Sequence, residues 1–481
     1  NLSAATSITG DLTISQGTLT TGSNHALTVA DVVTVNGSLT GNGSTLLFGS
    51  LKGTGTFNAP TTTVTIDDRD ESTGKALHID GMTIATNDLN VTITSAKNQD
   101  LQIGDDKIHD LTINHDTDAR INYFTANGSI DGDLTITRGI LNTFNRTLTV
   151  DGDCSIAADG KLEASVNGNV AVTLGSLTIA NGGIYNATSA TTEITNRTGG
   201  GYALQMVGTS AVINNNDGLF KFTLSDDVYV TMEGQSFHNV EIDLGASNEF
   251  RMTANNGAFD CEGYLYLTSG TFKFNDATDT LTVDGLLKLT AGTFGVNSPS
   301  GAWSVGSLQI DGGTFEATSG TTTIAGDLQN NGTYTHNDGT LTNNTSGVNI
   351  WGTSETVFYI LNATNRTLIS VDTTVEHSIT GGGQIRLNGL TSAGGMTLTM
   401  GTSTVAGSIT TGFFGMWNAN CTAKIYAASQ LKPWTIAADW QFGVAAGELW
   451  HLKWGDVDPD IITNDTYDNA KTITLDGDME F

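Results

Sequence analysis

A short phrase recurs along this chain at a nearly constant spacing. It reads GDLTISQGTLT from Gly10, GDLTITRGILN from Gly132, GSLTIANGGIY from Gly175 and GSLQIDGGTFE from Gly306. Consecutive copies begin at Gly263, Gly285, Gly306 and Gly326, so one step follows another at almost equal length. A period of about 20 residues indicates stacked coils, each made of one supersecondary unit.

Within each copy, apolar residues alternate with Thr or Ser. Leu12 and Ile14 flank Thr13, and a glycine turn follows. An alternation of period two is typical of a half-buried strand, and no segment has a clear helical period. We therefore predict an all-β protein, a right-handed parallel β-helix (β-solenoid) with coils of about 20 to 23 residues.

Composition agrees with many short strands joined by tight turns. The 481 residues include 58 Gly but only 4 Pro, and 38% are hydrophobic, which is enough for the thin core of a solenoid. Further phrases recur, FNAPTTTVTI from Phe57 with FEATSGTTTI from Phe315, and RTLTVDGDCSI from Arg146 with DTLTVDGLLKL from Asp279. Linked phrases of this kind strengthen the prediction of a repeat protein.

The repeat also predicts the domain organisation. Residues 1–411 carry the phrase and form a β-solenoid repeat region, whereas residues 412–470 lose it and form a Trp-rich irregular β region. Residues 471–481, KTITLDGDMEF, begin a further, incomplete repeat. Since an open coil would expose strand edges, we expect Phe481 to be a truncation, a cleavage point or the limit of what was built.

Charge and cysteine content exclude some partners. The chain has 20 basic and 50 acidic residues, a net charge of -30, so we expect no nucleic-acid partner. No run of apolar residues is long enough for a membrane-spanning helix, so we expect no membrane span. The three cysteines, Cys154, Cys261 and Cys421, are too far apart for a metal motif, and we expect them in core rows.

Acidic clusters are the candidates for catalysis, because polysaccharide cleavage uses paired carboxylates. The densest is the loop DDRDE at Asp67–Glu71, and acidic pairs recur at Asp105 with Asp106 and at Asp226 with Asp227. Asp is also a common turn residue for backbone reasons, and we favour solvated turns between coils. We predict no catalytic residues and no enzyme activity.

Metal sites have two candidates, both incomplete. Asp456, Asp458 and Asp460 alternate as in an oxygen-ligand loop for calcium, but Ile461 and Tyr467 stand where an EF-hand loop needs Gly and Glu. His109 and His115 lack the spacing of known zinc motifs, and we expect turn or surface positions for both. We expect no cofactor, with calcium as the one ion these residues suggest.

Tryptophan is concentrated near the end of the chain. Five of the 7 Trp lie close together, at Trp417, Trp434, Trp440, Trp450 and Trp454. Two interpretations stay open. The residues form the core of an inserted or irregular β region, or they form an exposed platform that stacks on sugar rings.

Phrases such as GDLTITRGILN, RTLTVDGDCSI and KTITLDGDMEF resemble the β-helical repeats of large structural proteins in tailed phages, especially marine ones. They are similar also to bacterial adhesin passengers. The resemblance covers roughly Ile8 to Thr411 and brings no catalytic residue with it.

The resemblance implies a virion surface protein, a tail fibre, spike or capsid-attached fibre, that acts as a rigid spacer and host-attachment element. Implied partners are other virion or surface proteins, host-surface glycans and, as in many phage fibres, two further copies of the chain in a trimer. The expected location is the virion surface or the extracellular space. The alternatives are a secreted bacterial adhesin of the same fold and, less favoured, a β-helix enzyme that degrades polysaccharides.

Overall fold

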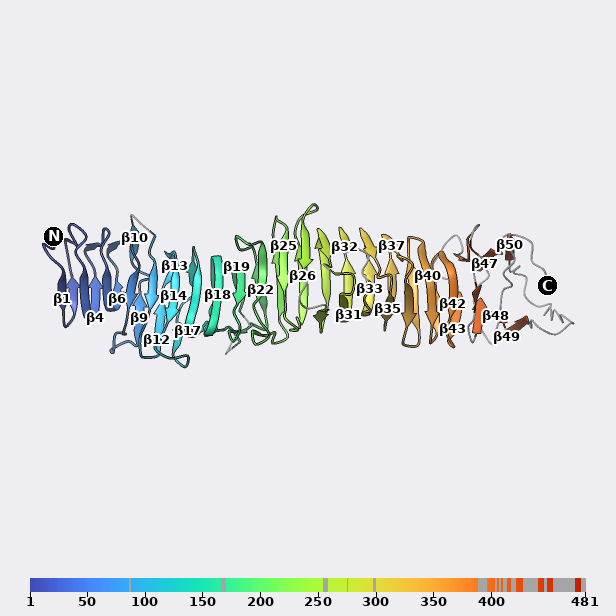
Figure 1. The fold of residues 1–481 in the computed structure, drawn as a ribbon, viewed down its shortest axis with the longest axis horizontal. Coiled ribbons are helices and arrows are strands. Elements are labelled where there is room, and N and C mark those ends of the chain that lie inside the picture. The colour runs from blue at the N-terminus through green and yellow to red at the C-terminus, as the bar shows by residue number, and fades with distance from the viewer. Residues whose placement is uncertain are drawn as a thin grey trace. The chain divides into compact units, whose positions relative to one another are not determined.

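The structure is a computed structural model in which β-strands are the only regular elements described (Figure 1). It describes residues 1–85, 88–165, 170–253, 258–274, 276–296, 300–387 and 396–402, together with Val405 and the strands β45 to β50 bounded below. Among these residues, no helix of the length and apolar character needed to cross a membrane occurs. Two compact units divide the chain, unit 1 at Asn1–Asn239 and unit 2 at Val240–Phe481.

Unit 1 is built from short strands that pair in parallel with strands of neighbouring coils. Its strands are β1 (Thr6–Ile8), β2 (Leu12–Ile14), β3 (Thr18–Thr20), β4 (Leu27–Val35), β5 (Ser38–Thr40), β6 (Leu46–Gly53), β7 (Thr56–Asn58), β8 (Val64–Ile66), β9 (Lys75–His78), β10 (Thr83–Ala85), β11 (Val91–Ile93), β12 (Gln99–Gln102), β13 (Gly104–Ile108), β14 (Leu111–Asn114), β15 (Ile121–Phe124), β16 (Gly128–Ile130), β17 (Leu134–Asn142), β18 (Leu148–Glu163), β19 (Val172–Ile179), β20 (Ile184–Asn186), β21 (Thr191–Ile194), β22 (Tyr202–Met206), β23 (Val212–Asn214), β24 (Leu219–Thr223) and β25 (Val228–Thr231).

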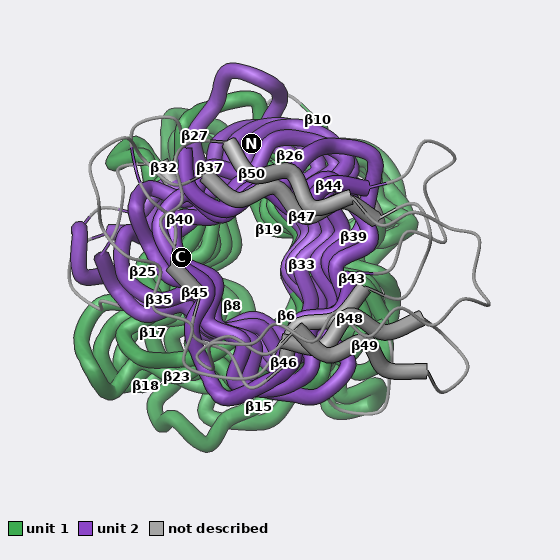
Figure 2. Tube along the Cα trace, turned by 90° about the vertical axis from the view of Figure 1, so that its right-hand side faces the viewer, with its two compact units in different colours: residues 1–239 green, residues 240–481 purple. Residues whose placement is uncertain are grey.

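Unit 2 has the same construction, and Figure 2 shows its coils, in purple, following one another around one axis. Its strands are β26 (Asn239–Asp243, which starts at the last residue of unit 1), β27 (Glu249–Met252), β28 (Ala258–Cys261), β29 (Leu265–Ser269), β30 (Thr271–Lys273), β31 (Thr280–Leu289), β32 (Thr293–Val296), β33 (Trp303–Ile310), β34 (Thr314–Glu316), β35 (Thr321–Ile324), β36 (Leu328–Asn330), β37 (Thr333–Thr335), β38 (Thr340–Asn343), β39 (Val348–Gly352), β40 (Thr356–Ala363), β41 (Thr367–Ile369), β42 (Thr373–Thr380), β43 (Gln384–Leu387), β44 (Met396–Met400), β45 (Ser408–Ile409), β46 (Phe413–Met416), β47 (Cys421–Tyr426), β48 (Trp440–Val444), β49 (Glu448–Leu452) and β50 (Thr472–Asp476).

The repeat phrase sets the register of neighbouring coils. Leu134 pairs with Cys154 and Cys154 pairs with Leu177, and these three residues occupy the same position in successive copies. The predicted all-β parallel solenoid is thereby confirmed, and the strands that the structure describes make about 18 turns. The right-handed crossover stays a prediction from the general preference of parallel connections.

Coil length varies more than the phrase suggests. The step from Val33 to its partner Leu51 is short, whereas the step from Ile184 to its partner Val212 is more than half as long again. The strands keep their register and the loops between them absorb the difference. Insertions in surface loops cost little, because the entropy of closing a loop grows slowly with its length.

The core of unit 2 contains a stack of aromatic rings, one per coil. Phe250, Phe272, Phe294 and Phe315 pair in register on β27, β30, β32 and β34, and each is fully buried. Successive ring centroids lie 5.3, 4.5 and 5.7 Å apart, with the rings stacked. Parallel in-register pairing places identical side chains above one another, so the repeated Phe becomes a ladder.

Parallel pairing continues beyond Thr411, where the phrase fades. β46 pairs with β43, β47 with β44, and β50 with β47. The last step, from Thr422 to Thr472, is more than twice as long as a typical coil, and an antiparallel pair, β48 with β49, lies within it. The boundary at residue 411 stays a prediction from the sequence.

Candidate functional site

The acidic loop at Asp67–Glu71 is tied to the following coil by Lys97. The Lys97 Nζ atom lies 2.8 Å from Asp68 Oδ1 and 2.5 Å from Glu71 Oε1. The guanidinium of Arg69 lies 3.3 Å from the other Glu71 oxygen. Hydrogen bonds from Lys97 and Arg69 lower the pKa of Glu71, and the two carboxylates raise the pKa of Lys97.

Asp70 is the buried member of this loop, with 5% of its surface exposed. Lys52 Nζ lies 2.7 Å from its carboxylate, and Ser72 donates two hydrogen bonds to it, from N at 2.9 Å and Oγ at 2.5 Å. Burial opposes the ionisation of Asp70, but these donors outweigh it and hold the pKa of its carboxyl well below the usual range. The carboxylate therefore stabilises the turn.

The remaining acidic groups differ from one another where their side chains are described. Burial and the neighbouring Asp68 carboxylate raise the pKa of Asp67. Arg197 lies 3.2 Å from Asp226 and donates to the backbone oxygen of Asp227 at 2.9 Å. The side chains of Asp105 and Asp106 lie outside the described residues. The pairing of Asp226 with Arg197 supports the interpretation of that acidic pair as a structural turn.

The two histidines differ, and the expected surface position is wrong for one of them. The His109 side chain is 41% exposed and lies 4.0 Å from Asp110. His115, in contrast, is 3% exposed. Its ring packs against Gly139 of the next coil, where an added Cβ would lie 2.6 Å from His115 Cδ2. The glycine makes room for the imidazole.

His115 belongs to a buried polar network within unit 1. Its Nδ1 lies 2.6 Å from the carbonyl oxygen of Ser95, and its Nε2 lies 2.6 Å from Asn122 Nδ2. Gln99 Nε2 donates to Asn122 Oδ1 at 2.9 Å. Since a carbonyl only accepts, the proton sits on Nδ1 and Nε2 accepts from Asn122. Burial lowers the pKa of His115 against the pull of these hydrogen bonds.

Alternation in the sequence is the signal that points to this network. Gln99 occupies the inward row of β12 with Leu101, and Asn122 occupies the inward row of β15 with Phe124. Polar residues at inward positions pair with one another when their coils are in register, as Gln99 and Asn122 do. The alternation is visible in the sequence, but the pairing of these two coils is not.

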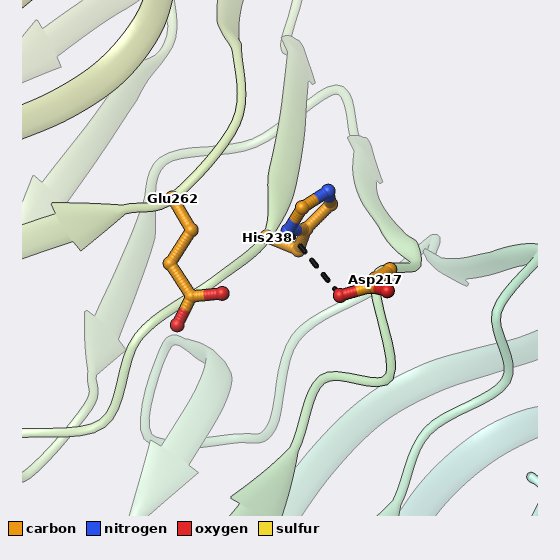
Figure 3. A group of neighbouring side chains, drawn as sticks. All are labelled: Asp217, His238 and Glu262. Atoms are coloured by element: carbon orange, nitrogen blue, oxygen red, sulfur yellow. Dashed lines mark ion pairs between the residues drawn. The ribbon is translucent and has the colours of Figure 1, made fainter.

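A further histidine, His238, lies beside a carboxylate of unit 1 (Figure 3). Its Nδ1 lies 3.7 Å from Asp217 Oδ1. Glu262, drawn in the same figure, belongs to unit 2. The unit 1 residues alone offer two ligand atoms, whereas protein zinc sites use three or four protein ligands.

Cys154 and Cys261 are buried, as predicted for core rows. Burial raises the pKa of each thiol to about 12. A thiol that stays protonated is a poor nucleophile and a poor metal ligand, so these two residues act as small apolar side chains. The side chain of Cys421 lies outside the described residues.

The Trp-rich segment is described only in its strands. Trp440 pairs with Leu452, and Trp450 pairs with Phe442, across the antiparallel β48 and β49. Trp417, Trp434 and Trp454 lie outside the described residues, as do Asp456, Asp458 and Asp460 of the calcium candidate. The choice between an aromatic core and a sugar-binding platform therefore stays open, and so does calcium binding.

An exposed tryptophan that sequence reasoning missed lies elsewhere in unit 2. Trp351, on β39, is 37% exposed, and β39 pairs with β41, which pairs with β43. Figure 2 labels β39 and β43 on the same side of the coils. We call the outward residues of these three strands and of the turns that lead into them the β39–β43 face. In the sequence, the position of Trp351 outside the Trp-rich segment is the feature that could have drawn attention to this face.

No protein-family model, no curated protein and no solved structure matches this chain. The proposals that follow are argued from the repeat, the fold and the positions of individual side chains.

Proposed function

We propose that this protein is a structural component of a virion surface, a tail fibre, spike or capsid-attached fibre, that acts as a rigid spacer and host-attachment element. The observation that carries the proposal is the in-register parallel stacking of coils within each unit. Backbone hydrogen bonds between coils make such a stack stiff along its axis. The resemblance of the repeat phrase to phage β-helical proteins supports the same role.

This role implies a location on the virion surface or in the extracellular space. The partners are other virion proteins, host-surface glycans and further copies of the chain, with a trimer suggested by the resemblance. A net charge of -30 supports the absence of nucleic acid among these partners, because a strongly anionic surface repels phosphate.

A non-catalytic role is part of the proposal. Lys97 or Lys52 forms an ion pair with each of Asp68, Asp70 and Glu71. These carboxylates therefore stabilise the turn. The purified chain should release no reducing ends from polysaccharides of its host. Release that disappears in the variant with both Asp67→Asn and Asp68→Asn would contradict the proposal and favour the polysaccharide-degrading alternative.

The secreted bacterial adhesin is the second candidate, because the phrase resembles adhesin passengers as well. Fractionation of the source material separates the two. Virus particles purified on a density gradient should contain the chain by mass spectrometry, and antibodies to it should label fibres or spikes in electron micrographs. Recovery of the chain only from the envelope of virus-free bacteria would overturn the virion proposal in favour of the adhesin.

A further inference from the structure

The β39–β43 face presents a defined set of side chains to solvent. In the register of these strands, Asn349 opposes Leu368, and Leu368 opposes Arg386. Thr367 and Ile369 are buried on either side of Leu368, so the alternating positions Arg366 and Leu368 point outward. Trp351 is the next outward residue after Asn349 on its strand.

Two arginines lie diagonally across adjacent coils of this face. Leu368 opposes Arg386, so Arg366, two residues earlier, lies opposite Gln384. Gln384 Oε1 accepts a hydrogen bond of 2.8 Å from Arg386 Nη2. Diagonal neighbours on paired strands are roughly 7 to 8 Å apart, within reach of long side chains. A single oxyanion between them can therefore contact both guanidinium groups.

Glycines flank the two arginines along the stack. The register places Gly347 beside Arg366 on the preceding coil, where an added Cβ would lie 3.3 Å from Arg366 Nη2. Gly415 opposes Arg386 on the following coil. With no side chain at either glycine, access to the guanidinium groups is not blocked at these two positions.

Arg366 carries a positive charge close to that of Arg386. Lys288 of unit 2, in contrast, pairs with Asp311 at 2.9 Å. Arg366 makes no ion pair with any residue that the structure describes. Burial and the neighbouring Arg366 lower the pKa of Arg386, so the two charges act on one another. An anion between them would relieve this repulsion.

The rest of the β39–β43 face offers apolar surface and hydrogen-bonding groups, the two kinds of contact that a sugar makes. Trp351 and Leu368 offer apolar surface, and Asn349 and Gln384 offer amides. Trp351 and Arg386 are separated by two coils and two residues, a span of roughly 12 Å between backbones. That distance suits a short oligosaccharide that carries a negative group at one end.

We propose that the β39–β43 face binds an acidic polysaccharide, with Arg366 and Arg386 holding its sulfate, phosphate or carboxylate group and Trp351 lying against a sugar ring. The inference deepens the attachment role proposed above and rests on it only for the origin of the glycan. Absence of the chain from purified virus particles would not contradict glycan binding at this face. Absence of glycan binding would not contradict the assignment to a virion.

The test uses the full chain and dextran sulfate, with uncharged dextran of the same length as the matched probe. The wild type should bind dextran sulfate and not dextran in calorimetry. Arg366→Gln and Arg386→Gln should each weaken binding about tenfold, as expected for the loss of a charge-assisted contact, and Trp351→Ala should weaken it to a similar degree. Trp351→Tyr should keep most of the affinity.

The matched control is Arg146→Gln, which removes the same charge from an exposed arginine in unit 1. It should bind like the wild type. Equal loss in Arg146→Gln, or no binding by the wild type, would overturn the proposal. Sodium sulfate that competes as well as the polymer at equal sulfate concentration would overturn its saccharide part. Far-UV circular dichroism of each variant verifies that the fold is kept.

Discussion

At the residue scale, a few glycines let neighbouring coils approach closely. Gly53 and Gly352 each end a strand with positive φ, 147° and 141°. A Cβ at either position would lie 2.0 Å from a carbonyl oxygen of the preceding coil, that of Val35 or of Asn330. Glycine therefore occurs at both positions although the surrounding sequences differ. Only glycine adopts this φ readily and leaves room for the carbonyl oxygen of the preceding coil.

Gly352→Ala should destabilise the protein by about 3 kcal/mol, since both the strained φ and the clash with backbone must be relieved. Gly382→Ala is the control, because a Cβ there meets nothing within 4 Å. Urea unfolding followed by circular dichroism measures the difference. Equal stability of the two variants would show that the coils separate more easily than the packing indicates.

His115 predicts a pH dependence at the same scale. Burial lowers its pKa in the folded chain, so the unfolded chain binds more protons near the ordinary value of about 6.5. The stability that the neutral ring contributes is present above that value and is lost as the pH falls through the folded pKa. The gap in unfolding free energy between wild type and His115→Gln should therefore narrow from pH 8 to pH 5. A constant gap would contradict a buried neutral imidazole.

At the element scale, in-register rows turn single residues into ladders. The aromatic row on β30, β32 and β34 is one example. Trp303 on β33 packs against this row, with its ring centroid 5.8 Å from that of Phe294. Polar rows obey the same rule. Asn343 donates to Thr367 Oγ1 at 2.7 Å and accepts from the Asn365 backbone at 3.1 Å, so a buried amide is satisfied between coils.

Phe294→Ala should cost about 3 to 5 kcal/mol, because it removes a fully buried ring that touches rings on both neighbouring coils. Phe294→Leu should recover part of that loss by refilling the space. Phe144→Ala, at a side chain that is 45% exposed, should change stability far less. Thermal unfolding of the three variants tests the order, and a large loss in Phe144→Ala alone would contradict it.

At the scale of the whole molecule, charge is the dominant feature. With 50 acidic and 20 basic residues, the folded chain repels itself, and salt screens that repulsion. Ion pairs such as Lys97 with Glu71 relieve the excess only locally. Because the β39–β43 face carries two arginines in an anionic chain, the binding of a polyanion depends on a small area rather than on the net charge.

The melting temperature should rise as NaCl is added from low concentration, and calorimetry measures it. CaCl2 and MgCl2 at equal ionic strength should raise it equally, because no cofactor is expected. A saturable rise specific to calcium, lost on Asp456→Asn and Asp460→Asn together, would instead establish the calcium loop. A melting temperature that falls with NaCl would contradict the repulsion argument.

Much of the fold could be predicted from alternation alone. Leu134, Ile136 and Leu177 are buried where the phrase places them inward, and the aromatic residues Phe57 and Phe315 that open a second phrase are buried too. The positions of polar side chains were harder to predict. The surface position is wrong for His115, because groups from other coils, the Ser95 carbonyl oxygen and Gly139, enclose its ring.

Alternation and period are local properties of the chain, so they were sufficient to define the strands, their inward rows and a coil of about 20 to 23 residues where the phrase is intact. Which side chains of different coils meet follows only from the folded chain. Loops between coils vary in length, so that the step between register partners is short from Val33 to Leu51 and long from Ile184 to Val212. Period predicts that a residue faces outward, but register places Arg366 and Arg386 on one face with Trp351.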